Sequence, residues 1–307
     1  MGELKFFKNF CNILSGHVSK GKIKQMKKHT WLIIVILFTA LCANVFGQTT
    51  TTRPFEVKKS GQGKQAIIFI PGLGCSGEVW NETVEKFEKN YTCYTLTMAG
   101  FAGAQPQPEA TFTNWETQIA RYIRENNIQK PIIIGHSVGG GLTLAIAADY
   151  PQLVEKIIVV DALPCLSALQ NPKFKPKENN DCTPIINQFT SLNNEQFEQM
   201  QKSGIAGLVS DTLTQKKVIG WTMQSDRKTF AGLFCDFLNT DLREKLKAIQ
   251  CPALILLESP FIRLKPAIEV QYKNLKTAQL QYSSKALHFI MFDDKEWYQN
   301  QLTGFIK

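Results

Sequence analysis

The chain has 307 residues, of which 44% are hydrophobic and 20% are charged, and its formal net charge is +9. This length fits one α/β domain with an insertion, and the composition is that of an ordinary globular protein. The charge is uneven, because residues 1–47 carry seven lysines and one glutamate, which leaves residues 48–307 at only +3. No basic blocks interleaved with aromatics occur in that part, so the sequence predicts no nucleic-acid partner.

The N-terminal segment has the layout of a secretory signal peptide. Two lysines after Met26 are followed by an apolar run of 13 residues, Trp31–Ala43, and then by Val45 and Gly47 at the −3 and −1 positions of a cleavage site. We therefore expect translation to start at Met26, and the exported (periplasmic or extracellular) protein to begin near Gln48. The alternative is an uncleaved leader that anchors the protein in a membrane, although 13 apolar residues are short for a span.

Eight cysteines are present, two of them in the leader. An exported protein can use the other six in disulfides, for which 15 pairings are possible, or bury them as small apolar residues. No Cys/His spacing typical of a metal site occurs, so we expect no metal. The six are Cys75, Cys93, Cys165, Cys182, Cys235 and Cys251.

Apolar strand-like segments alternate with segments of helical periodicity, which predicts a mostly parallel sheet with helices on both faces. The predicted strands are Ala66–Ile70, Tyr91–Met98, Pro131–Ile134, Lys156–Val160, Pro252–Leu257 and Gln279–Tyr282. The predicted helices are Glu78–Lys89, Thr113–Asn126, Val138–Tyr150, Ala267–Leu275 and a last one from about Asp294.

The alternation is interrupted at 164–235, a polar, Asn/Gln-rich segment that is helical where its pattern is readable. We interpret it as a helical lid inserted into the core, which then comprises 62–163 and 236–307. Residues 1–47 form the leader, and 48–61 contain a polar linker and the region of the first strand.

The motif GHSVGG, Gly135–Gly140, follows a predicted strand and opens a predicted helix. A serine on so tight a turn has its hydroxyl above the ends of the strands, and close packing around the turn requires Gly135 and Gly139. The N-terminus of the following helix favours negative charge that develops there. Ser137 is therefore the candidate nucleophile, and the alternative is a glycine-rich packing turn without chemistry.

The candidate base follows by elimination among four histidines. His17 and His29 lie in the leader, and His136 is the variable position of the turn, where we expect its side chain to point away from the serine. His288 remains, between the last predicted strand and the last predicted helix. A loop at the carboxyl edge of the sheet can carry its ring to Ser137, where it would take up and return the hydroxyl proton. The alternative is a structural histidine.

An oxyanion hole needs backbone N–H donors aimed at the tetrahedral oxygen. We expect one from Val138, directly after the nucleophile, and one from Leu73, in the loop Pro71–Trp80 that follows the first apolar strand. The alternative for this Gly- and Pro-containing loop is a plain turn.

Four segments together resemble the α/β-hydrolase superfamily, and most closely its bacterial lipase/esterase-like branch with a helical cap. They are Pro71–Trp80, Met98–Gly103, Gly135–Gly140 and the stretch ALHFIMFDD that contains His288. The resemblance spans about residues 62–307. It implies the α/β-hydrolase fold, with a mostly parallel central sheet, helices on both faces and an inserted helical lid. It also implies an enzyme without a cofactor that cleaves an ester, amide or related bond.

The sequence departs from this family at the acid of the catalytic triad. Family members usually carry an aspartate a few residues past the penultimate strand, but that position falls near Phe261. Two other carboxylates end strands: Asp161, where some members place the acid, and Glu258. We expect a carboxylate oxygen of Asp161 within hydrogen-bond reach of the His288 ring, with Glu258 as the alternative acid.

These residues predict an exported serine hydrolase that acts on a small, apolar, ester-like substrate, amides and thioesters included. Apolar residues of the lid can line an acyl pocket, although such residues at helical spacing are more often packing residues. Two alternatives stay open: a ligand-binding pseudo-enzyme, suggested by the displaced acid, and a lyase or C–C hydrolase that uses the same triad. The oligomeric state is open, and membrane contact is expected only through an uncleaved leader.

Overall fold

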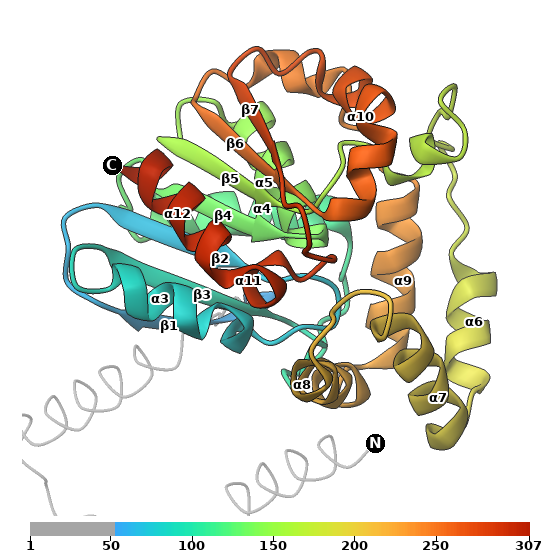
Figure 1. Cartoon of the computed structure of the whole chain (residues 1–307). Helices are drawn as coiled ribbons and strands as arrows, with labels where there is room; N and C mark the ends of the chain where they lie inside the picture. Colours follow the sequence, from blue (N-terminus) through green and yellow to red (C-terminus); the bar gives the residue numbers. More distant parts are fainter. Residues whose placement is uncertain (1–52) are drawn as a thin grey trace, which may run out of the picture. The chain divides into compact units, whose positions relative to one another are not determined.

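The computed structural model describes residues 53–307, so the predicted leader and its cleavage site lie outside the described residues. A seven-stranded sheet forms the centre of this part (Figure 1), with the strand order β1-β3-β2-β4-β5-β6-β7. Neighbouring strands are parallel except that β1 runs antiparallel to β3. The strands are β1 (Phe55–Ser60), β2 (Ala66–Ile70), β3 (Thr92–Met98), β4 (Ile132–His136), β5 (Lys156–Val160), β6 (Ala253–Leu257) and β7 (Ala278–Tyr282).

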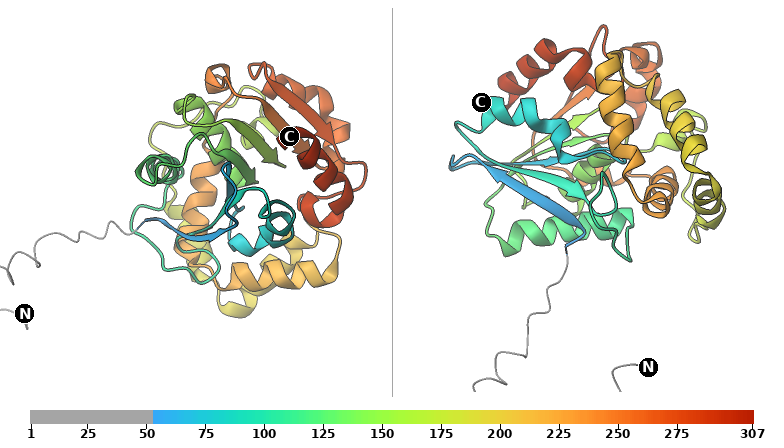
Figure 2. Two further views of the ribbon diagram at one scale, coloured as in Figure 1. Left: turned by 90° about the vertical axis from the view of Figure 1, so that its left-hand side faces the viewer. Right: turned by 90° about the horizontal axis from the view of Figure 1, so that it is seen from below.

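Both faces of the sheet are buried, which explains the continuous apolar runs of its central strands. In β2, Ile68 and Ile70 belong to one apolar cluster, whereas Ile67 and Phe69 belong to the other. Helices cover both faces (Figure 2). Packed on the first cluster are α4 (Phe112–Glu125), α5 (Val138–Asp149) and α10 (Lys265–Tyr272), and on the second α3 (Asn81–Phe87), α11 (Ile290–Asp293) and α12 (Lys295–Ile306). No helix between residues 53 and 307 is long and apolar enough to cross a bilayer.

The predicted alternation of strands and helices is confirmed, and the differences are the ends of elements, one divided helix and the short helix α11, which the sequence does not predict. β4 continues two residues beyond its predicted end, to His136, because His136 still pairs with Val160 of β5. The predicted helix over 78–89 is divided into a 3₁₀ turn, Gly77–Trp80, and α3. Ser76 caps this turn through its hydroxyl, which accepts from the N–H of Glu78.

Four helices occupy the insertion between β5 and β6: α6 (Thr183–Ser191), α7 (Asn194–Ile205), α8 (Thr212–Met223) and α9 (Arg227–Leu238). Polar side chains begin three of them, which is how a polar sequence can form short helices. Asn193 forms a capping box with Gln196 on α7, and Asp211 and Asp226 cap α8 and α9. This lid, α6 to α9, lies over the carboxyl ends of the strands (Figure 1).

The six cysteines of residues 53–307 form one disulfide and four buried thiols. Cys182, at the start of α6, is joined to Cys235 of α9. The free thiols are apolar packing residues, and burial raises the pKa of Cys75 to about 12. Both uses that the sequence left open for its cysteines therefore occur in the described chain.

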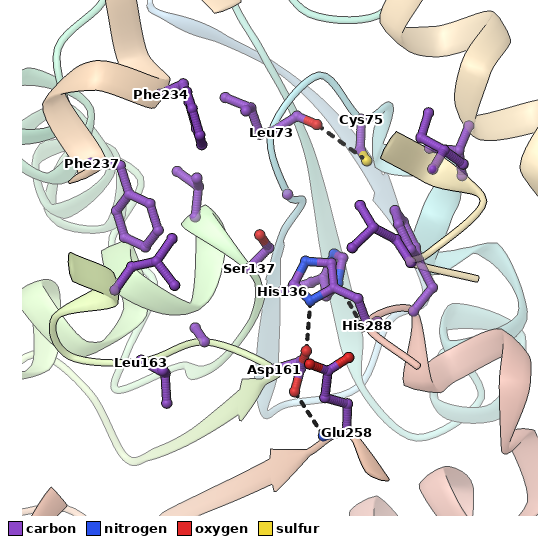
Figure 3. Close-up of a pocket in the computed structure, with 18 of the residues that line it drawn as sticks. Leu73, Cys75, His136, Ser137, Asp161, Leu163, Phe234, Phe237, Glu258 and His288 are labelled. Atoms are coloured by element: carbon purple, nitrogen blue, oxygen red, sulfur yellow. Dashed lines mark hydrogen bonds and ion pairs between the residues drawn. The ribbon is translucent and has the colours of Figure 1, made fainter. Parts of the chain in front are cut away.

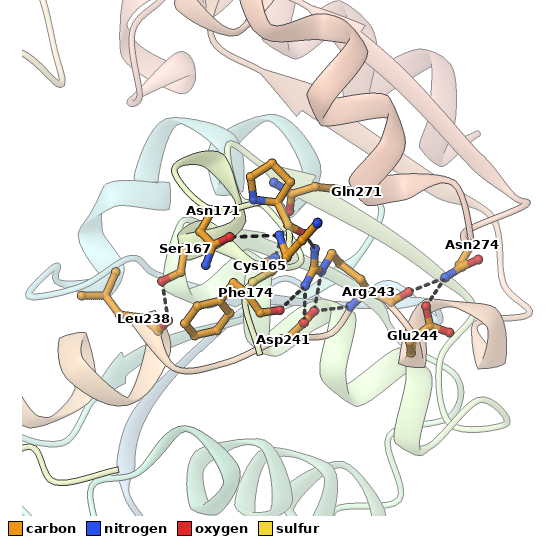
Figure 4. A network of polar contacts seen from close by, with 12 residues as sticks. Cys165, Ser167, Asn171, Phe174, Leu238, Asp241, Arg243, Glu244, Gln271 and Asn274 are labelled. Atoms are coloured by element: carbon orange, nitrogen blue, oxygen red, sulfur yellow. Dashed lines mark hydrogen bonds and ion pairs between the residues drawn. The ribbon is translucent and has the colours of Figure 1, made fainter. Parts of the chain in front are cut away.

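A polar network fixes the base of the lid (Figure 4). The guanidinium of Arg243, which follows α9, forms an ion pair with Asp241 at 2.6 Å. The same guanidinium donates to the carbonyl oxygens of Pro172 and Phe174. Because the planar guanidinium makes several hydrogen bonds in fixed directions, it ties the chain that enters the lid to the chain that leaves it.

Candidate active site

Ser137 occupies the turn between β4 and α5. Its backbone angles, φ 54° and ψ −123°, lie outside the regions that L-residues ordinarily adopt. The turn is also tightly packed: a Cβ on Gly135 would lie 2.1 Å from the carbonyl oxygen of Gly139, and a Cβ on Gly139 would lie 2.3 Å from that of Ile70. These glycines therefore let strand and helix approach closely enough to hold the strained serine at the carboxyl edge of the sheet.

His288 lies in the loop between β7 and α11, and Asp161 directly follows β5. Nδ1 of His288 is 2.6 Å from Oδ2 of Asp161, so its N–H donates to the carboxylate. The hydrogen bond that the sequence predicts between these two side chains is present. Ser137 lies beside them in the wall of one cavity (Figure 3). No hydrogen bond joins the Ser137 and His288 side chains. In enzymes without substrate the distance between nucleophile and base is often long, and it shortens when substrate binds.

Asp161 is fixed by burial and by a second hydrogen bond. Its side chain is fully buried, and the backbone N–H of Glu258 donates to its Oδ1 at 2.7 Å. Its φ of 49° is positive, as at Ser137. The alternative acid, Glu258, makes no hydrogen bond to the imidazole with its own carboxylate. Glu258 therefore orients Asp161 through its main chain, and the partner of His288 is Asp161.

Three ionisable groups in this cavity influence one another. Burial raises the pKa of Asp161, and its hydrogen bond to His288 offsets this only in part. Burial opposes protonation of His288, but the hydrogen bond and charge of Asp161, together with the charge of Glu258, raise the pKa of the ring above its usual value. Burial and then the charge of Asp161 raise the pKa of Glu258 to about 7. The surroundings of His288 therefore stabilise the imidazolium.

His136 packs directly against His288. Its buried side chain lines the cavity, and its ring centroid is 4.6 Å from that of His288. Its Nε2 donates to the carbonyl oxygen of His288 at 3.1 Å. Burial and then the charge of His288 hold the pKa of His136 well below its usual value, so the ring stays neutral. The sequence predicts only that His136 points away from Ser137; the structure adds that its ring packs against His288 and supports the loop that carries it.

Leu73 and Val138 both line the cavity with Ser137. Within residues 53–307, neither of their backbone N–H groups donates to another protein group, since Leu73 lies in a turn and Val138 is the first residue of α5. The lid packs against the loop that holds Leu73: a Cβ on Gly74, whose φ is 69°, would lie 2.7 Å from the ring of Phe230. The two amides are therefore free to bind an oxygen in the cavity.

The cavity has a volume of about 400 Å³ and lies between the sheet edge and the lid. Its walls are mainly apolar. The apolar side chains that line it include Leu163, after β5, and Phe234 and Phe237 of α9 (Figure 3). Phe261, at the position where family members usually carry the acid, also lines it. No lysine or arginine of the described chain does so. Residues 53–307 hold no cluster of three or more His, Cys, Asp or Glu that could bind a metal ion.

Comparison with known proteins agrees with this architecture. The sequence pattern of the alpha/beta hydrolase fold matches residues 65–183, which contain the Leu73 loop, Ser137 and Asp161. A pimeloyl-[acyl-carrier protein] methyl ester esterase from Proteus mirabilis is 25% identical over 197 residues, which is 64% of this chain and 74% of the relative. The same enzyme from Citrobacter koseri is 27% identical over 199 residues, again 64% of this chain and 75% of the relative.

Solved structures show the same fold. The enol-lactonase from Burkholderia xenovorans superposes with a TM-score of 0.69 at 13% identity, over 82% of this chain and 96% of the other. An esterase from Exiguobacterium antarcticum superposes with a TM-score of 0.68 at 17% identity, over 82% and 95%. With the matching family pattern, these results show that the chain is an enzyme with the α/β-hydrolase fold.

Proposed function

We propose that this enzyme is an exported serine esterase that cleaves ester-like bonds in small, apolar molecules. One observation carries the catalytic part of the proposal: the 2.6 Å hydrogen bond between His288 and the buried Asp161, in the wall of the cavity that Ser137 also lines. This arrangement brings together a hydroxyl, a base and a group that orients the base, which are the components of nucleophilic acyl transfer.

The proposed mechanism has two steps. Ser137 Oγ attacks the substrate carbonyl while Nε2 of His288 takes the hydroxyl proton, and Asp161 stabilises the imidazolium through Nδ1. The amides of Leu73 and Val138 donate to the oxyanion, and the imidazolium returns the proton to the leaving alcohol. A water molecule then attacks the acyl-serine, again with His288 as base, and releases the acid and free Ser137.

The cavity favours uncharged acyl groups. Its walls are mainly apolar, and it contains two carboxyl groups but no lysine or arginine among the described residues, so a substrate anion would find no counter-charge there. The curated relatives are esterases of a methyl ester, and one neighbour in structure is an enol-lactonase. These names support a carboxylic ester over an amide as the bond that is cleaved.

A chain-length series of p-nitrophenyl esters tests this function. We expect turnover with a maximum at one acyl length, set by the size of the cavity, and no turnover above background in Ser137→Ala. Labelling by a fluorophosphonate probe, present in the wild type and absent in Ser137→Ala, checks the nucleophile independently of the substrate. Absence of both turnover and labelling in the wild type would instead favour a ligand-binding pseudo-enzyme.

Export is supported by the signal-peptide layout of the sequence and by the Cys182–Cys235 disulfide. Disulfides persist in oxidising compartments and are rare in the cytosol. The two observations are independent, because the leader and the lid are far apart in the sequence.

A further inference from the structure

Glu258 is the one carboxyl group of the cavity wall that the proposed mechanism does not use. It directly follows β6, and its backbone N–H is already engaged by Asp161. Its half-buried carboxyl group makes no hydrogen bond to any other residue of the described chain, and it lies next to the Asp161 carboxylate in the cavity (Figure 3). The carboxyl group is only partly desolvated, which already raises its pKa, and no protein group in the described chain compensates its charge through a hydrogen bond.

The charged groups that face Glu258 are those of the proposed triad. Asp161, at the end of β5, raises its pKa, and His288, from the loop after β7, lowers it. Tyr272 of α10 donates its hydroxyl to the carbonyl oxygen of Ala162 at 2.6 Å and stays protonated, because burial and then the charge of Asp161 raise its pKa. The electrostatic partners of Glu258 are therefore Asp161 and the imidazole.

We propose that Glu258 is a positioning residue for the base: its carboxylate is a second negative charge beside the Asp161–His288 pair and stabilises the imidazolium that forms when Ser137 attacks. This inference rests on the proposed function and deepens it. Asp161 supplies the hydrogen bond and fixes the tautomer, whereas Glu258 acts through charge alone. Protonation of Glu258 removes that charge, so the imidazole and Glu258 titrate as a coupled pair.

The isosteric variant Glu258→Gln tests the proposal, because it removes the charge and keeps the backbone N–H that binds Asp161. In this variant the imidazolium loses one stabilising charge. We expect the acid limb of the kcat/KM profile to move to lower pH, since His288 then stays neutral in more acidic solution. We also expect kcat on the alkaline plateau, at about pH 8, to fall roughly three- to tenfold. Glu125→Gln, an exposed change of the same chemistry on α4, should leave both unchanged.

A merely structural role for Glu258 would lower kcat without moving the acid limb, and an unmoved limb overturns the proposal. Charge rescue adds a further check. The variant Glu258→Asp keeps a negative charge, so the pH midpoint of its acid limb should lie between those of the wild type and Glu258→Gln. Equal midpoints in Glu258→Asp and Glu258→Gln would contradict a role for the charge.

A measurement without turnover separates this proposal from the proposed function. In the inactive Ser137→Ala protein, the His288 ring signals can be followed by NMR as a function of pH and assigned by comparison with His288→Asn. We expect the titration midpoint of His288 to be lower when Glu258→Gln is added. The His136 ring is distinguished from it because burial and the charge of His288 hold the pKa of His136 well below its usual value, whereas that of His288 is raised. A wild type that hydrolyses no ester would defeat the esterase proposal, whereas an unchanged His288 midpoint would defeat this one.

Discussion

Ser137 and Asp161 both have positive φ angles, 54° and 49°, although neither is a glycine. Such conformations cost about 1–3 kcal/mol each and persist only where the surroundings enforce them. At Ser137 the enforcement comes from the close approach of Gly135 and Gly139, and at Asp161 from the N–H of Glu258. Both residues lie at the carboxyl edge of the sheet, in the wall of the cavity that His288 also lines.

The first prediction concerns Ser137 and His288 as one functional unit. We expect Ser137→Ala and His288→Ala each to lower kcat by roughly 10³-fold or more, and the double variant to be little worse than either, because the base has no function without the hydroxyl. Ester hydrolysis by the purified variants measures this, with the exposed Ser203→Ala on α7 as the control. Losses that simply multiply in the double variant would show that His288 acts elsewhere.

The second prediction assigns the acid. An asparagine in place of Asp161 can still occupy the site but cannot stabilise the imidazolium, so we expect Asp161→Asn to lower kcat roughly several hundred-fold. Asp181→Asn, an exposed change in the lid, should have almost no effect on kcat. Steady-state kinetics with Glu258→Gln in parallel decides between the carboxylates. A larger loss in Glu258→Gln than in Asp161→Asn would transfer the acid role to Glu258.

At the scale of single residues, the sequence predicts the candidate catalytic residues but not all of the residues that contact them. Ser137 and His288 follow from a local motif and from elimination, and Asp161 from the apolar residue at the usual position of the acid. The packing of His136 under His288 joins residues 152 positions apart, which no local pattern contains. The role of Glu258 was also hidden, because only the structure shows that its main chain, rather than its carboxylate, holds Asp161.

At the scale of elements, the core was more predictable than the lid. The central strands are buried on both faces and therefore have continuous apolar sequences that periodicity detects. In the lid, α6 contains no buried residue and α8 has only three, so no apolar stripe marks their ends. Their limits depend on caps such as Asp211, and the disulfide that joins α6 to α9 could not be selected among 15 pairings.

The third prediction concerns this disulfide. Cys182 and Cys235 are 53 residues apart and connect α6 to α9, so their bond restricts the unfolded chain. Reduction should therefore lower the free energy of unfolding by about 2–4 kcal/mol. Urea unfolding with and without dithiothreitol measures the difference. In the Cys182→Ser/Cys235→Ser variant the reductant should have no effect, which excludes a contribution from the four buried thiols. An equal response of both proteins would contradict the prediction.

At the scale of the whole molecule, the distribution of charge bears on the substrate, and the disulfide bears on the compartment. Most of the excess positive charge belongs to residues 1–47, whereas the cavity of the described chain is lined by carboxyl groups and apolar side chains. The basic character of the sequence therefore comes mainly from residues 1–47 rather than from the site. A lid joined by a disulfide over an apolar cavity fits an enzyme that meets uncharged substrates in an oxidising compartment.

The last prediction concerns export. Cleavage after Gly47 would remove the apolar run and leave the sheet intact, because its first strand begins only at Phe55. We therefore expect N-terminal sequencing of protein from the extracytoplasmic fraction to begin at or within a few residues of Gln48. Alkylation before reduction should leave Cys182 and Cys235 unmodified in that fraction. A bulky residue at the cleavage site, Gly47→Tyr, should block processing and retain the leader. Wild-type protein that still contains Lys27 after export would show that the leader is an anchor.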